Sequence, residues 1–106
     1  MTEIAWPFLP LMGMGLLATI DEDGSPHQGP AHVFYDGECY YVRMLEESRE
    51  LANLRRDPRF SLNTHDPNEG GKRIVIRGHV MEARLERSTG LMYVRVGVES
   101  VDDFDA

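Results

Sequence analysis

Alternation of apolar and polar positions dominates the chain and predicts short β-strands. Apolar, β-branched and aromatic residues gather in runs of five to thirteen residues, and turn-forming residues separate the runs. The dipeptide Asp36-Gly37 between two of the runs is a strong signal for a β-hairpin. The predicted strands cover residues 16–20, 28–35, 39–44, 60–64, 73–85 and 92–98.

The run at residues 73–85 changes phase along its length. A one-residue change of phase near Gly78 predicts a β-bulge, and bulges help a sheet to curl into a barrel. The predicted inward-facing residues are Ile74 and Ile76 before the change, then Met81, Ala83 and Leu85 after it.

The pattern becomes helical only near residues 46–56. Leu51 and Leu54 are three residues apart, Ser48 can cap the first turn, and Pro58 stops the helix. One short helix from about Ser48 to Arg56 is therefore expected.

The two ends of the chain carry weaker patterns. Residues 1–12 contain two prolines, so we expect a short helical or irregular N-terminal lid whose Trp6 and Phe8 pack against the barrel. The acidic residues 102–106 are expected to fray. Six strands with one helix lack a βαβ alternation, which predicts a mainly β single domain over residues 1–106, an antiparallel six-stranded barrel.

Composition excludes several classes of function. A net charge of -7 argues against nucleic acid and anionic membranes as partners, because both recruit a surplus of Lys and Arg. The apolar runs are too short for a bilayer span, so a cytoplasmic protein is expected. The single cysteine, Cys39, excludes an intrachain disulfide and favours a small buried side chain.

The sequence offers neither a metal motif nor an activated nucleophile. His27 and His32 are five residues apart, so they point to opposite faces of a regular strand and do not share a metal. No serine has the Gly-x-Ser-x-Gly setting of a nucleophile elbow. We therefore predict no metal site, and no catalytic residue is assigned.

Three stretches of the chain share a pattern with known proteins: residues 17–27, residues 53–59 with the motif Asn-Leu-Arg-Arg-Asp-Pro-Arg, and residues 74–80. Together they resemble the FMN-binding split-barrel family of pyridoxamine 5'-phosphate oxidase-like proteins. The resemblance implies the split-barrel fold with one short helix. It also implies a homodimer with a cofactor in the groove between subunits, and a small-molecule ligand.

The resemblance also points to the cofactor site. Typical members hold the cofactor phosphate with a Thr, then an Arg or Ser, then a Lys, and these places fall at Met44, Ser48 and Glu50 when the chain is aligned on Asn53. Only the Ser can still donate a hydrogen bond, and Arg43, Arg49 or Arg55 would have to compensate. The candidate cofactor-binding residues are Arg43, Ser48, Arg49, Asn53 and Arg55.

Two functions remain open. The first is a flavin-dependent or deazaflavin-dependent oxidoreductase acting on an unidentified small organic substrate, with FMN as the expected cofactor and a deazaflavin coenzyme or haem as alternatives. In such enzymes the bound ring carries the redox step, so the missing nucleophile is no evidence against activity. The second is a non-catalytic binding module that has lost the phosphate site. Retained framework residues favour the first, and the changed phosphate positions favour the second.

Overall fold

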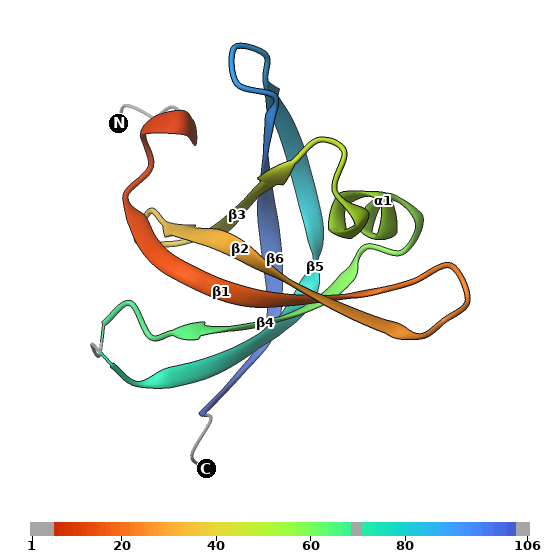
Figure 1. Cartoon of the computed structure of the whole chain (residues 1–106). Coiled ribbons are helices and arrows are strands. Elements are labelled where there is room, and N and C mark those ends of the chain that lie inside the picture. Colours follow the sequence, from red (N-terminus) through yellow and green to blue (C-terminus); the bar gives the residue numbers. More distant parts are fainter. Residues whose placement is uncertain (1–5, 69–70, 104–106) are drawn as a thin grey trace.

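The computed structural model describes residues 6–68 and 71–103 and folds them into one closed β-barrel. The strands run antiparallel in the order β1-β2-β3-β6-β5-β4 (Figure 1). This arrangement confirms the predicted six-stranded barrel with one short helix. The elements are η1 (Trp6–Phe8), β1 (Leu11–Ile20), β2 (Pro26–Tyr35), β3 (Tyr40–Leu45), α1 (Arg49–Arg56), β4 (Arg59–His65), β5 (Arg73–Glu86) and β6 (Leu91–Asp103).

The long β5–β6 hairpin contains the predicted bulge. Register shifts fall between Arg77 and Gly78 and again between Val80 and Glu82. At the first shift the backbones approach so closely that a Cβ on Gly78 would collide with the carbonyl oxygen of Gly97. Glycine is therefore needed at position 78 for the two strands to meet there.

The prediction that Met81, Ala83 and Leu85 face the core is wrong. All three are exposed, Met81 to 56% of its surface. Ala83 and Leu85 pair with buried residues of β6, but their part of the hairpin extends past the closed part of the barrel (Figure 1). The alternation was identified correctly for Ala83 and Leu85, whereas Met81 is the unpaired residue at the second register shift; within residues 6–68 and 71–103 these side chains remain exposed.

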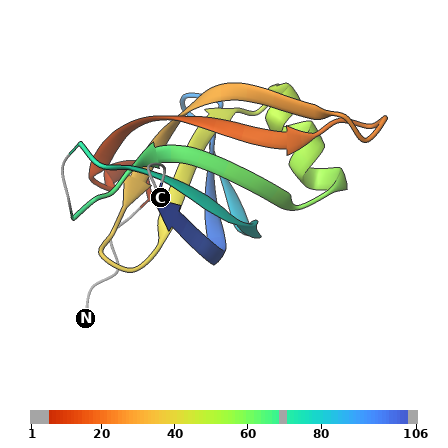
Figure 2. The same ribbon diagram turned by 90° about the horizontal axis from the view of Figure 1, so that it is seen from below.

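The core fills the barrel and is closed at one end by α1. Leu17, Leu62 and Val94 are fully buried in it. Leu51 and Leu54 of α1 join the same cluster, and Figure 2 shows the helix at one end of the flattened barrel. The side chain of Ser48 caps the helix, as predicted. Burying the apolar face of α1 holds its first turn against β1 and β2.

A second cluster lies on the outer face of β2, β3 and β6. Trp6 is 3% exposed and packs there with residues that include Phe34, Tyr41 and Tyr93. The predicted packing of the N-terminal segment is confirmed for Trp6 but wrong for Phe8, which is 80% exposed. The segment is shorter than the expected lid of residues 1–12, because β1 already begins at Leu11; residues 1–5 lie outside the described part.

The C-terminal end is more ordered than predicted. Asp102 and Asp103 belong to β6 rather than to a frayed tail, because Arg77 forms an ion pair with Asp102 and Lys72 with Asp103. Residues 104–106 lie outside the described part. Within residues 6–68 and 71–103, α1 and η1 are both too short to cross a membrane.

Candidate functional site

The first turn of α1 is already occupied by the chain's own groups. The Oγ of Ser48 accepts a hydrogen bond from the backbone N–H of Leu51 at 3.2 Å. Glu50 also lies in this turn, where a carboxylate stabilises the positive end of the helix dipole. The same carboxylate repels any external anion that approaches these N–H groups.

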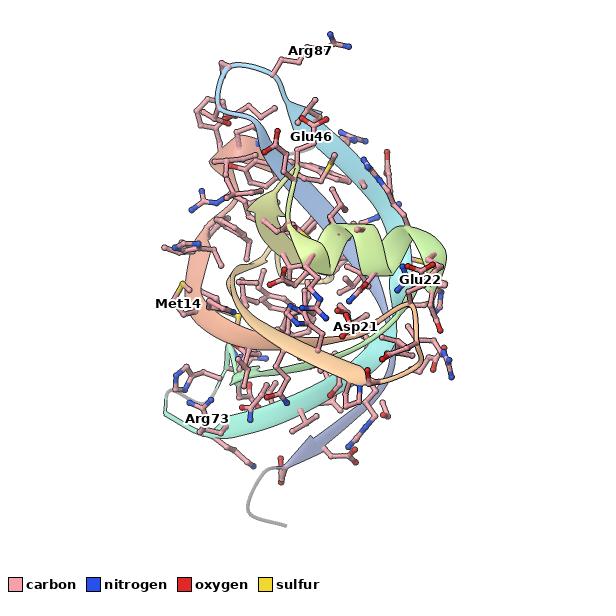
Figure 3. All side chains as sticks on the ribbon, turned by 45° about the vertical axis from the view of Figure 1, so that its right-hand side comes forward. Met14, Asp21, Glu22, Glu46, Arg73 and Arg87 are labelled. Atoms are coloured by element: carbon pink, nitrogen blue, oxygen red, sulfur yellow. The ribbon has the colours of Figure 1, made fainter. Side chains whose placement is uncertain are left out.

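A hydrogen-bonded network joins α1 to the end of β1. Arg49 donates from Nε and Nη2 to the two carboxylate oxygens of Asp21, at 2.9 and 2.7 Å. The Nδ2 of Asn53 donates to Asp21 at 2.9 Å and to the hydroxyl of Thr19 at 3.0 Å. Arg56 donates to the amide oxygen of Asn53 at 2.9 Å. Figure 3 shows Asp21 close to α1.

The charge of Arg49 in this network is matched by Asp21. The hydrogen bonds from Arg49 and then from Asn53 lower the pKa of Asp21 below its usual value, so the residue stays a carboxylate near neutral pH. A surface hollow of about 440 Å³ opens beside the network. Its arginines are Arg49 and Arg56, and both are already engaged by chain acceptors. Arg49 is paired with Asp21, whereas Arg56 donates only to neutral oxygens. The carboxylates of Asp21, Glu22 and Asp23 line the same hollow and disfavour a phosphate there.

Glu50 turns toward β2 rather than toward solvent. Its side chain is 15% exposed, and its Oε1 lies 3.6 Å from the Nε2 of His27. The carboxylate also lies against the backbone of Gly29, where a Cβ would collide with it. The position at which family members offer a lysine thus holds a half-buried carboxylate facing an imidazole.

Arg43 lies elsewhere, on the outer face of β3. Its guanidinium carbon is 5.2 Å from the ring centre of Phe34 and 5.9 Å from that of Tyr93. Its Nη1 donates to the Tyr93 hydroxyl at 3.4 Å, a long hydrogen bond. On β1, the same outer face exposes Leu11, Met14 and Leu16, and Figure 3 shows Met14 on the side of the barrel away from Asp21.

The predicted cofactor-binding residues therefore separate into two places. Ser48, Arg49 and Asn53 lie together at α1, where they hold the chain's own groups. Arg55 is exposed on the helix and forms no hydrogen bond or ion pair within the described residues. Arg43 lies on the outer face with two aromatic rings.

Sequence reasoning missed the partners of these residues. Tyr93 had a usable signal, because it alternates with the inward residues Met92 and Val94 and so had to face outward beside Arg43. The pairs Asp21–Arg49 and His27–Glu50 join residues far apart in the sequence and had no local signal.

The histidines do not gather into a metal site. His79 pairs with Glu99 at 3.1 Å and His27 with Glu50, whereas His32 lies in the outer-face row next to Arg43. Over residues 6–68 and 71–103, no group of three His, Cys, Asp or Glu side chains is placed to hold a metal ion.

The sequence matches one protein family, and the fold is similar to several solved structures. Residues 1–98 match the family described as pyridoxamine 5'-phosphate oxidase. Among curated proteins, none matches the chain. An F420 reductase has a similar structure, with a TM-score of 0.71 at 17% identity over 96% of this chain and 98% of that chain.

Two further solved structures share the fold. A putative pyridoxamine 5'-phosphate oxidase from Listeria innocua gives a TM-score of 0.69 at 15% identity, over 88% of this chain and 89% of that chain. The haem storage protein HutZ from Vibrio cholerae gives 0.64 at 20% identity, over 85% and 84%. At such low identity these likenesses establish the fold alone.

Proposed function

Because the chain belongs to the pyridoxamine 5'-phosphate oxidase family, we propose that it is an oxidoreductase that uses a flavin or deazaflavin coenzyme on a small organic substrate. The observation that carries the proposal is the outer face of β1, β2, β3 and β6. There a half-buried arginine lies against two aromatic rings, beside the exposed apolar side chains of β1. A flat conjugated ring matches such a surface, because it buries apolar area and stacks on a guanidinium.

The ring and the phosphate of a flavin mononucleotide do not fit this chain equally well. The flavin ring matches the outer face, which offers apolar side chains and a guanidinium on which the ring can stack. The usual phosphate position at α1 is not, because Glu50 is negative, Arg49 is engaged by Asp21, and Met44 is 7% exposed in the barrel core. The proposal is therefore a coenzyme held through its ring on the outer face, without a phosphate contact at α1.

The protein's own residues would bind and orient the coenzyme. Phe34 and Tyr93 hold the Arg43 guanidinium against the sheet, and its remaining N–H groups have no acceptor among the described residues. Met14 and Leu16 supply apolar contact on the neighbouring strand. A bound flavin or deazaflavin would supply the hydride chemistry. The fold likeness to an F420 reductase supports the deazaflavin form, and the family supports FMN.

A binding module without catalysis is the second candidate. The observation that favours it is the network at α1, in which Arg49 is engaged by Asp21 and Glu50 faces His27, so that the usual phosphate position is negative. On this proposal the barrel would bind a ligand or a partner through its outer face. The same face would serve haem if His32 provided an axial ligand, as the likeness to a haem storage protein suggests.

An absorption titration tests the proposal. The purified protein would be mixed in separate samples with FMN, riboflavin, coenzyme F420 and haemin, and followed between the near ultraviolet and the red. The oxidoreductase proposal expects a shifted flavin or deazaflavin band and reduction of the bound ring by a hydride donor. Binding of haemin alone, with a sharpened Soret band, would support the haem alternative, and no binding of any of the four would support the module without cofactor.

A further inference from the structure

Four residues form one row across the outer face of the barrel. In the strand register Met14 of β1 is opposite His32 of β2, His32 is opposite Arg43 of β3, and Arg43 is opposite Tyr93 of β6. Directly opposite residues in antiparallel strands have Cβ atoms about 4.5 to 5.5 Å apart. The row, which we call the outer row, is thus a continuous strip of an apolar, an imidazole, a cationic and an aromatic side chain.

Arg43 has unused hydrogen-bonding capacity. A guanidinium carries five N–H donors, and this one makes a single long hydrogen bond, to Tyr93. Within residues 6–68 and 71–103 no carboxylate forms an ion pair with it, whereas Arg49, Arg59 and Arg77 each have an aspartate. A half-buried cation over aromatic rings has lost part of its hydration, so an external anion is its natural partner.

The imidazole of His32 is similarly available. Within the described residues it forms no hydrogen bond or ion pair, and it is half-buried between Met14 and Arg43 in the outer row. Its ring and the Tyr93 ring flank the guanidinium on the two neighbouring strands. A ligand that reaches Arg43 therefore meets the imidazole and, beyond it, the exposed apolar side chains of Met14 and Leu16 on β1, whereas Tyr93, which is 3% exposed, supports the guanidinium rather than the ligand.

The helix end is closed to the same ligand. An anion at α1 would meet Glu50, and it would compete with Asp21 for Arg49. At Arg43 it would meet a free guanidinium. A single planar guanidinium matches a carboxylate in a bidentate geometry, whereas a phosphate dianion usually draws on several cations or helix N–H groups.

We propose that the outer row is the ligand site and that it takes a flat conjugated molecule bearing a carboxylate, which Arg43 binds. This inference rests on the proposed function and specifies the chemical class of its ligand. Arg43 is the anion-binding residue, Tyr93 and Phe34 fix its guanidinium, and His32 and Met14 contact the ring system. The Arg49–Asp21 pair has no part in ligand binding.

The experiment uses 1-pyrenebutyrate and 1-pyrenebutanol as fluorescent probes. The two share the flat ring and differ only in the terminal group, so their comparison isolates the carboxylate. Arg43→Gln removes the charge, Arg43→Lys keeps it without the planar fork, and Arg49→Gln is the matched control at α1. We expect Arg43→Gln to weaken pyrenebutyrate binding by about tenfold to a hundredfold, with a smaller loss in Arg43→Lys. Pyrenebutanol affinity should be the same in all variants, and Arg49→Gln should change neither probe.

Each other outcome overturns the inference. Equal pyrenebutyrate affinity in the unmodified chain and in Arg43→Gln excludes Arg43, and an equal loss in Arg49→Gln returns the anion site to α1. If Arg43→Gln fails to fold, Arg43→Lys alone decides, because undiminished binding in that variant excludes the bidentate contact. A parallel titration with FMN, riboflavin and coenzyme F420 separates the two proposals: binding of one of these without pyrenebutyrate binding rejects this inference alone, and no binding of any of them rejects the proposed function as well.

Discussion

At the scale of single residues, position 50 controls the charge of the helix end. Glu50 is largely buried against Gly29 and faces His27, so its carboxylate both stabilises the first turn of α1 and makes the surrounding potential negative. Neighbouring Arg49 cannot offset this, because its charge is matched by Asp21. The Glu50 side chain therefore disfavours a phosphate at this helix end.

Glu50→Lys should raise the affinity for FMN. Exchanging a repulsive contact for an attractive one at a partly buried site is worth roughly 1 to 3 kcal/mol, or about tenfold to a hundredfold in affinity. Riboflavin, which has no phosphate, should bind equally to both proteins. The measurement is a flavin-fluorescence titration, with Glu47→Lys as a control because it makes the same charge change at an exposed position. Tight FMN binding by the unmodified chain, or no gain in Glu50→Lys, would show that the phosphate is held elsewhere.

Asn53 should contribute to the stability of the fold and not to the affinity for a cofactor. It is 3% exposed, and its amide bonds with Thr19, Asp21 and Arg56. Asn53→Ala leaves these groups short of partners, so we expect a loss of about 1 to 3 kcal/mol in the free energy of unfolding. Urea titration measures the loss, and flavin titration of the remaining folded protein should show unchanged affinity. Asn63→Ala is the control: it removes a single exposed hydrogen bond, from Arg73, at a half-exposed position and should cost about 1 kcal/mol or less.

At the scale of elements, the β5–β6 hairpin is shaped by glycine. Gly78 allows the close approach to Gly97, and the register shifts on either side of this point bend the longest pair of strands around the barrel. In the closed barrel β6 pairs with β3 and β5 pairs with β4, so barrel closure depends on this bend of the hairpin.

Gly78→Ala should therefore destabilise the barrel strongly. The added methyl collides with a backbone carbonyl, which cannot move without breaking the hairpin register, and we expect a loss of about 3 kcal/mol or more. Gly24→Ala is the comparison, because Gly24 has a φ of 88° but open space around it, so only backbone strain of about 1 to 2 kcal/mol is added. Thermal unfolding of both variants measures the difference, and a smaller loss in Gly78→Ala than in Gly24→Ala would show that the hairpin tolerates a shift.

The end of α1 should contribute to the acid sensitivity of the protein. Hydrogen bonds from Arg59 lower the pKa of Asp57 from 3.8 to about 2. As the pH falls, the unfolded chain takes up this proton first, so the stabilisation is complete above about pH 4 and is lost toward pH 2. In Asp57→Asn we expect lower stability at neutral pH and a shallower acid limb. Denaturant midpoints measured from pH 7 to pH 2 test this, with Glu22→Gln as the control. If the midpoint of Asp57→Asn falls with pH as steeply as the midpoints of the unmodified chain and of Glu22→Gln, the prediction is wrong.

Elements and their order could be predicted from the sequence because their causes are local. Alternation identified the strands, and Ser48 and Pro58 bracketed the helix. The phase change along residues 73–85 predicted a bulge, and a register shift does lie at Gly78, but the extra residue there is on β6 and the phase of β5 changes at Met81. The exposure of Met81 could not be predicted, because it depends on what covers the hairpin. The same holds for the site: Arg43 was a candidate from its position, but its aromatic neighbours and the engagement of Arg49 by Asp21 arise from contacts across strands.

At the scale of the whole molecule, the surface combines a strong negative charge with an exposed apolar strip. The net charge is -7, yet Leu11, Met14 and Leu16 on the outer face of β1 are 58%, 48% and 39% exposed. Neighbouring apolar side chains on one sheet face typically mark an interaction site. This strip borders the outer row, so a partner that covered it would also enclose the proposed ligand site.

We expect the chain to be a homodimer that packs through this strip. A small barrel buries a limited core by itself, and a two-fold contact would let the same apolar residues of both copies cover each other. Met14→Glu should then give a monomer, because it places a carboxylate on the strip of each copy, close to its own two-fold equivalent. Val101→Glu is the control: Val101 is 50% exposed on β6, away from the strip, and this variant should remain dimeric. Light scattering at micromolar concentration measures all three masses. A monomeric unmodified chain would exclude the dimer, and a dimer that survives Met14→Glu but not Val101→Glu would move the interface to β6 and leave the outer row open to solvent.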